Sequence, residues 1–319
     1  MPALLLTMTL CLAAADPADR SCVLIVVGAP GAPEYGAEFR RWAGLWRAAA
    51  EKGGAESITI GEAEGDGADR DALKQAIADK GTAGREPLWI VLIGHGTFDG
   101  REPKFNLRGP DVAAAELAEW LKPIQRPLAV VNCASSSGPF INALSGADRV
   151  VATATRSGDE QNFARLGQYL AEAIADSAAD LDKDGQVSLL EAFLTASART
   201  QEFYRSKARL ATEHALIDDD GDKLGTPADW FRGVHATKRV KSGATADGAR
   251  AHQLHLIKND REQRMSPEVR DRRDQLERAA SDLRATKGAI PDDAYYHRLE
   301  KIMVDLARLY RDSSPEDGR

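Results

Sequence analysis

The sequence lacks an excess of positive charge, and it lacks a long apolar segment after its first residues. Its 319 residues carry a net charge of −7, and the pI is near 5.5. A surface of this sign repels phosphate, so nucleic acid is not expected as a partner. No segment beyond the amino terminus is apolar over the length that a membrane helix needs, so no membrane span is expected.

The amino terminus has a different composition. Residues 1–15 contain a short apolar core that ends in Ala13-Ala14-Ala15, a small-residue site of the kind at which export signals are cleaved. We therefore predict a signal peptide over 1–15 and an exported protein, periplasmic or extracellular. No Lys or Arg precedes the apolar core, so a mispredicted start or a frayed terminus is the alternative.

Apolar residues make up 43% of the chain, which is enough for a sizeable core. Continuous apolar runs bounded by turn residues predict buried strands at 22–27, 87–93, 127–132 and 149–154, with a shorter strand at 57–60. Apolar residues at helical spacing predict helices over 34–52, 69–80, 111–121 and 162–175. This alternation predicts an α/β fold with a mainly parallel sheet and helices on both faces.

The carboxyl-terminal part has a different pattern. Residues 237–250 are basic and rich in small residues, which is typical of a linker. After it, Ser266-Pro267 begins a helix that Gly288 ends, and a second apolar stripe runs over 295–310. We predict an α/β domain over 22–236, a linker over 237–250 and a helical hairpin over 251–313.

Two side chains suited to catalysis follow two of the predicted strands. His95 comes after the strand at 87–93, and Cys133 comes directly after the strand at 127–132. Open α/β sheets place their chemistry beyond the carboxyl ends of their strands. If these strands are neighbours, the imidazole and the thiol face each other, and an imidazolium stabilises a reactive thiolate.

The three cysteines leave little scope for a disulfide. Cys11 would be removed with the signal peptide, which leaves Cys22 at the start of one strand and Cys133 at the end of another. In parallel strands of this length the two positions lie about 20 Å apart. A bridge needs Cα atoms within about 7 Å, so Cys133 is predicted to be a free thiol.

The segments Ile93-Gly-His95-Gly96 and Val131-Asn-Cys133-Ala-Ser-Ser-Ser resemble the caspase and legumain clan of cysteine peptidases, and the resemblance covers residues 22–169. It implies a caspase-like sheet and a cysteine endopeptidase that acts on a protein or peptide substrate. Cys133 would be the nucleophile, and His95 would assist it and protonate the leaving amine. The backbone N–H groups of Gly96 and Cys133 would stabilise the oxyanion.

A calcium loop is predicted over residues 180–191. An EF-hand loop needs oxygen ligands at positions 1, 3, 5, 7, 9 and 12 and a glycine at position 6, and Gly185 occupies that position. The corresponding ligands are Asp180, Asp182, Asp184, the carbonyl of Gln186, Ser188 and Glu191. Ser188 and Glu191 also form a capping box for the next helix, which explains these two residues without a metal.

Two weaker metal motifs remain open. The acidic run 218–222 lacks the closing glutamate of an EF-hand loop. It either holds a calcium ion of its own or forms a solvated turn, and we favour the solvated turn. His252 and His255 are spaced for one helix face, but two histidines without a third ligand are a weak signal.

These observations support two functional hypotheses. The first is an endopeptidase in which calcium orders a segment near the substrate cleft. The second is a non-catalytic caspase-like module that binds calcium and docks a protein partner on its helical hairpin. Cys133 reactivity distinguishes them, because a binding module needs no thiolate. A phosphate-binding interpretation of Gly28-Ala-Pro-Gly31 is weak, since the glycine spacing matches neither common phosphate-cradling motif.

Overall fold

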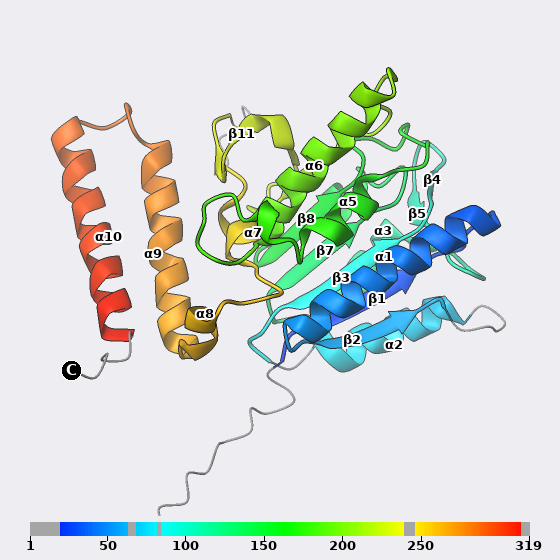
Figure 1. Ribbon diagram of the computed structural model, residues 1–319, viewed down its shortest axis with the longest axis horizontal. Helices are drawn as coiled ribbons and strands as arrows, with labels where there is room; N and C mark the ends of the chain where they lie inside the picture. The colour runs from blue at the N-terminus through cyan, green and yellow to red at the C-terminus, as the bar shows by residue number, and fades with distance from the viewer. Residues whose placement is uncertain (1–19, 63–67, 82–83, 239–245, 314–319) are drawn as a thin grey trace, which may run out of the picture.

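The computed structural model describes residues 20–62, 68–81, 84–238 and 246–313 (Figure 1). The predicted signal peptide at 1–15 lies outside the described residues. Within the described ranges, no helix is both long enough and apolar enough to cross a membrane.

The centre of the molecule is a seven-stranded sheet with the order β10-β9-β8-β7-β3-β1-β2. Five strands run parallel and are β1 (Cys22–Val27), β2 (Glu56–Ile60), β3 (Leu88–Ile93), β7 (Leu128–Asn132) and β8 (Arg149–Thr153). Two short strands extend the sheet in antiparallel pairing, β9 (Leu216–Asp218) and β10 (Thr226–Pro227). The prediction of a mainly parallel sheet is therefore confirmed.

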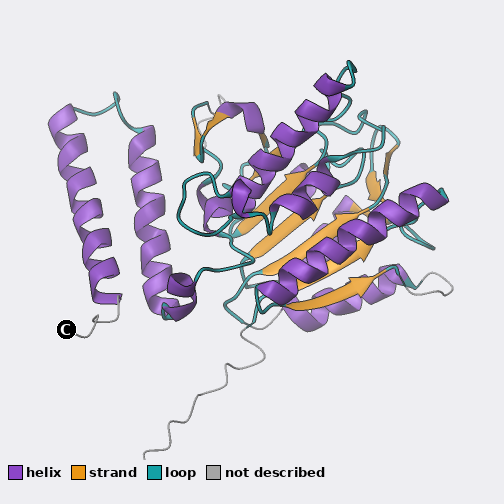
Figure 2. Cartoon of the chain, in the orientation of Figure 1, coloured by secondary structure: helices purple, strands orange, loops and turns teal. Residues whose placement is uncertain are grey.

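Helices cover both faces of the sheet, as predicted (Figures 1 and 2). One face carries α1 (Pro33–Lys52), α5 (Leu166–Ala173) and α6 (Leu189–Ser206). The other carries α2 (Asp69–Gly81), α3 (Ala114–Leu121) and α4 (Phe140–Leu144). Because strand side chains alternate, Val23 and Ile25 pack under the first set, and Leu24 packs under the second.

A small antiparallel sheet corrects the sequence interpretation beyond His95. None of the predicted strands lies between residues 93 and 127, but β4 (Gly96–Phe98), β5 (Pro103–Phe105) and β6 (Val112–Ala113) pair with one another. The helix expected to begin at Asp111 begins at Ala114. The Asp111 carboxylate instead accepts hydrogen bonds from the Leu107 N–H and the Asn106 side chain, so it holds the turn before β6.

Two 3₁₀ helices contact α6, and a short antiparallel strand pair follows the second of them. They are the 3₁₀ helices η2 (Ser177–Ala179) and η3 (Ala228–Trp230), and the strand pair β11 (Phe231–Arg232) and β12 (His235–Ala236).

The predicted linker and hairpin need new boundaries. Part of the linker, from residue 246 onward, packs on the domain: Asp247 is buried, and α7 (Ala249–Gln253) begins before residue 250. Ala251, Leu254 and Leu256 belong to the same hydrophobic core as α1 and α6. After the short α8 (Asp260–Arg264), the helices α9 (Pro267–Ala285) and α10 (Asp292–Ser313) form the hairpin, which stands beside the sheet domain in Figure 1.

Arg126 joins the amino-terminal ends of three strands. Its guanidinium donates to the carbonyls of Glu86 at 2.6 Å, Arg20 at 2.7 Å and Lys80 at 3.0 Å, and the side chain is buried. A buried carbonyl without a hydrogen-bond donor lowers the stability of the fold. The Arg126 side chain supplies donors to carbonyls that have no partner in the strand pairing.

We expect Arg126→Met to lower the free energy of unfolding by about 3 kcal/mol, because it leaves several buried carbonyls without a donor. Urea unfolding followed by circular dichroism would measure the change. The matched control is Arg40→Met, at an exposed position, for which we expect a change within about 0.5 kcal/mol. Equal effects of the two substitutions would contradict the structural role of Arg126.

Candidate functional site

His95 lies just past the end of β3, with its ring against α1. Nε2 lies 3.2 Å from the carbonyl oxygen of Pro30, and a carbonyl only accepts, so Nε2 carries the proton. The ring packs edge-on against Tyr35 and Phe39, with centroids 5.0 and 5.2 Å away. Burial lowers the pKa of His95, although the bond to Pro30 opposes this shift. The imidazole is therefore neutral at neutral pH, and Nδ1 is its basic nitrogen.

Cys133 comes directly after β7. Its side chain is 1% exposed and lies in the hydrophobic core beneath α1 and α5. Burial raises the pKa of the thiol to about 12, and the carboxylate of Glu213 adds to the rise. The Cys133 N–H donates to the carbonyl of Leu92 at 2.9 Å, as in a strand pair, so this donor is already engaged.

Neither Cys133 nor Cys22 forms a disulfide, which confirms the predicted free thiol at Cys133. In the part of the chain that the structure describes, no hydrogen bond joins the Cys133 thiol to the His95 ring. Space around the thiol is also limited. A Cβ atom added at Gly167 of α5 would lie only 2.6 Å from the Cβ of Cys133.

Ser135 contacts Gly96, the residue that follows His95. The β3–β7 pairing ends with Leu92 opposite Asn132, and the chain bends and turns at residues 134–136. The Ser135 hydroxyl accepts from the Gly96 N–H and donates to the Gly96 carbonyl, both at 3.2 Å. Gly96 is thus brought together with a hydroxyl group and not with the thiol.

The sequence interpretation missed Ser135, because its contact with Gly96 depends on the pairing of two strands that local patterns do not fix. His95 lies two residues beyond the last residue of β3, whereas Cys133 lies one residue beyond β7. The same depth past β7 is the position of Ala134, one residue before Ser135. The next residue, Ser136, has φ of 55°, a left-handed conformation that is strained for a residue with a side chain.

The loop over 180–191 has the local geometry of a tight acidic turn. Lys183 and Gly185 have φ of 64° and 91°, and the Asp180 carboxylate accepts from both of their N–H groups, at 2.7 and 3.1 Å. Carboxylate oxygens of Asp180, Asp182 and Asp184 lie within 4.8 Å of one another. Such a cluster of hard oxygen atoms suits a calcium ion.

The last two predicted ligands take part in the capping box. The Ser188 hydroxyl accepts from the Glu191 N–H, and the Glu191 carboxylate accepts from Ser188 N–H at 2.9 Å. Its other oxygen accepts from the Leu181 N–H at 2.7 Å, which draws Glu191 back to the start of the loop. Glu191 therefore serves the helix and still lies beside the acidic residues.

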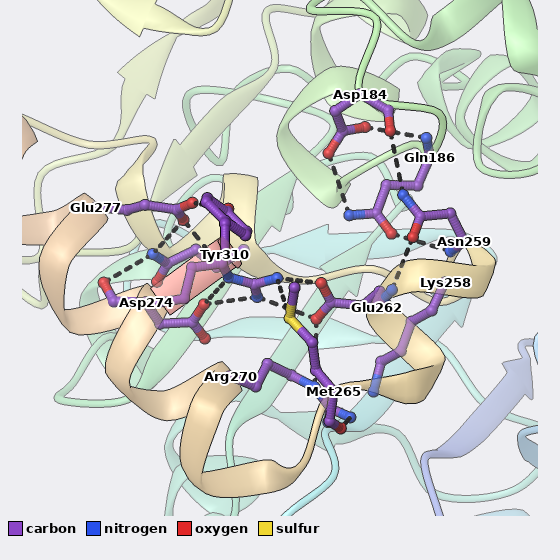
Figure 3. A network of polar contacts seen from close by, with 12 residues as sticks. Asp184, Gln186, Lys258, Asn259, Glu262, Met265, Arg270, Asp274, Glu277 and Tyr310 are labelled. Atoms are coloured by element: carbon purple, nitrogen blue, oxygen red, sulfur yellow. Dashed lines mark hydrogen bonds and ion pairs between the residues drawn. The ribbon is translucent and has the colours of Figure 1, made fainter. Parts of the chain in front are cut away.

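The loop is tied to the hairpin through Asn259 (Figure 3). The backbone N–H of Asn259 donates to the side-chain oxygen of Gln186 at 3.1 Å. The side-chain amide of Asn259 donates to the backbone carbonyl of Asp184, also at 3.1 Å. The Asn259 side-chain oxygen caps α8 by accepting from the Glu262 N–H at 2.8 Å. Glu262 is buried and pairs with Arg273 of α9.

The two histidines of the His252-x-x-His255 motif have different surroundings. His252 Nε2 lies 3.0 Å from the Asp182 carboxylate, and its nitrogen is grouped with ligand oxygens of Asp182 and Glu191. His255 is buried, and its burial lowers the pKa of the ring to about 3. Among the described residues, the two rings share no candidate metal cluster.

No protein-family model matches the chain, and no curated protein matches it. Several solved structures are similar in fold. The initiator caspase Dronc of Drosophila is 16% identical with a TM-score of 0.41, over 65% of this chain and 82% of that chain. Caspase-1 of Spodoptera frugiperda is 9% identical with a TM-score of 0.39, over 63% and 86%. A protein of Geobacter sulfurreducens is 14% identical with a TM-score of 0.39, over 56% and 89%.

We expect the Cys133 thiol to react slowly with iodoacetamide in the native protein. With Cys11 and Cys22 replaced by Ser, the rate at pH 7 should be at least about a thousandfold below that of an ordinary thiol, because a pKa near 12 leaves so little thiolate. The rate should rise to the ordinary value in denaturant. Rapid alkylation at pH 7 that is lost in His95→Ala would contradict this expectation.

Proposed function

We propose that this protein is a caspase-like, calcium-binding scaffold that does not use Cys133 as a nucleophile and that presents its carboxyl-terminal hairpin to a protein partner. The observation that carries the proposal is the position of the thiol. Cys133 is 1% exposed, and its pKa is raised to about 12. A cysteine peptidase needs a thiolate near neutral pH and a path by which substrate reaches it.

The charge near the Cys133 thiol also favours the scaffold hypothesis over the peptidase hypothesis. The acidic side chain of Glu213 lies close enough to raise the pKa of Cys133 further, whereas a catalytic thiol needs a cation beside it. His95 is a weak source of that cation, because burial lowers its pKa. Both shifts oppose the ion pair on which the peptidase hypothesis depends.

Calcium binding by the loop 180–191 is the second part of the proposal. It is supported by the three clustered carboxylates and by the left-handed Gly185 at the bend. Burial raises the pKa of Asp184, and the neighbouring carboxylate of Asp182 adds to the rise. A divalent cation at this position would offset that repulsion.

The partner would dock on α10, the outer helix of the hairpin. Tyr296, Met303 and Val304 of α10 are among the most exposed large apolar side chains of the described residues, with exposed fractions of 52, 44 and 40%. Tyr296 and Met303 also line one shallow surface hollow. Aromatic and methionine side chains are enriched at protein interfaces, so this face suits a protein better than a small molecule.

We expect calcium to slow amide hydrogen exchange in α8 as well as in the loop, because Asn259 bonds to both. In Asn259→Ala the protection of the loop should persist while the protection of α8 is lost. Asn162→Ala, at an exposed position, serves as the control. Protection of α8 that is unchanged in Asn259→Ala would contradict the proposed coupling, whereas no calcium effect on the loop would contradict the calcium site itself.

A second candidate function is hydrolysis by Ser135. The hydroxyl contacts the N–H of Gly96, which an oxyanion would need, and the neighbouring His95 is neutral with a basic Nδ1. Against it, Ser135 is 3% exposed, and its hydroxyl is already bonded to the Gly96 backbone on both sides.

Labelling with a fluorophosphonate separates the two functions. For the scaffold we expect no adduct on Ser135 and no cleavage of a peptide library. An adduct that disappears in both Ser135→Ala and His95→Ala but persists in Ser157→Ala would establish the hydrolase instead. Mass spectrometry of the intact chain and of its peptides would locate the adduct.

A further inference from the structure

We infer that Asp218, Asp220 and Asp247 form a second site for a divalent cation of the calcium type, separate from the loop 180–191. The site joins the antiparallel edge of the sheet to the segment that precedes α7. It assigns a role to the acidic run 218–222, for which a solvated turn was the favoured interpretation, and to the far end of the predicted linker.

The three carboxylates come from two distant parts of the chain. Asp218 is the last residue of β9, Asp220 follows it, and Asp247 lies just before α7. Their carboxylate oxygens lie within 4.8 Å of one another. The chain turns sharply between them, since Gly221 and Lys223 have φ of 86° and 71°. A solvated turn would expose these side chains, but Asp218 is 0% exposed and Asp247 is 7% exposed.

One carboxylate oxygen of Asp218 has no partner, which indicates that a ligand belongs there. Asp218 Oδ1 accepts from the Ser145 hydroxyl at 2.9 Å and from the Gly221 N–H at 3.3 Å. Asp218 Oδ2 is buried and has no hydrogen-bond partner. A buried carboxylate oxygen without a donor costs free energy, and such atoms are rare in folded proteins. A cation between the three carboxylates would satisfy it.

Neither Asp218 nor Asp247 forms an ion pair with any residue that the structure describes. Both carboxylates are nonetheless buried, and their oxygens lie within 4.8 Å of each other and of an oxygen of Asp220. Buried carboxylates that are forced together either take up protons or bind a cation.

The hydrogen bonds around the group fix its shape before any ion binds. Asp247 Oδ1 accepts from the Asp219 N–H at 2.9 Å, and Oδ2 accepts from the Thr226 hydroxyl at 2.5 Å. The Asp219 carboxylate accepts from the N–H groups of Gly248, Arg250 and Ala251 at the start of α7. Asp219 is therefore occupied as a helix cap, and it is not counted as a ligand.

The ligand set defines the class of ion. All three groups are carboxylates, and no histidine or cysteine belongs to the cluster, which favours a hard cation over zinc or copper. Calcium accepts irregular sets of oxygen ligands completed by carbonyls and water, whereas magnesium requires a stricter octahedron. Calcium is therefore the expected occupant.

Equilibrium dialysis of the full chain against calcium tests the site in a background in which the loop 180–191 is disabled by Asp180→Asn with Asp184→Asn. We expect this background to retain a bound calcium ion per chain and to lose it when Asp247→Asn is added. Adding Asp282→Asn instead, at an exposed position of α9, removes the same charge and should leave binding unchanged.

Thermal melts show whether each variant is folded. Without calcium, Asp247→Asn should melt at the same temperature as its parent or higher, because it removes one carboxylate from a repulsive cluster. With calcium, only chains that keep all three carboxylates should gain in melting temperature. If Asp247→Asn does not fold, Asp220→Asn gives the same comparison at a less buried position.

The absence of bound calcium in the disabled-loop background would overturn the inference, as would equal binding in the Asp247→Asn and Asp282→Asn chains. Neither result bears on the loop 180–191, which is tested in the otherwise unaltered chain.

Discussion

The pairing of β3 with β7 determines what stands at the carboxyl edge of the sheet. Both strands are buried on both faces, so a slip of one residue would turn a whole row of side chains toward the wrong helices. Just past the paired residues, the Cys133 N–H bonds to the carbonyl of Leu92, and the Ser135 hydroxyl bonds to the backbone of Gly96. The candidate site follows from this backbone pairing before any side-chain chemistry is considered.

The sequence predicted the fold better than the site, and the reason is physical. Continuous apolar runs indicate buried strands such as 22–27 and 127–132, and apolar residues at helical spacing indicate helices such as α1. Each of these elements can therefore be predicted from its own residues. The contact between Gly96 and Ser135 depends on the pairing of β3 with β7, which the sequence does not reveal. The short strands β9 and β10 were missed because they gain their stability from the sheet edge and not from their own few residues.

The carboxyl-terminal half was difficult for the same reason. Residues 246–250 resemble a linker in composition, yet Asp219 accepts from three N–H groups at the start of α7 and fastens this segment to β9. One turn later His252 reaches Asp182 of the acidic loop. The short helix α7 thus lies between two groups of carboxylates that are far apart in the sequence. Its position is set by long-range polar contacts, which local patterns do not contain.

Gly167 shows how closely the region behind the sheet is packed. A Cβ atom there would lie 2.6 Å from the Cβ of Cys133 and 3.0 Å from the ring of Trp42. Any side chain at position 167 would therefore overlap with the residue at 133, and a larger residue at 133 would push against α5. The two positions share one small volume, so their substitutions are coupled. In evolution, residues 133 and 167 would be expected to change together or not at all, whatever the function of the protein.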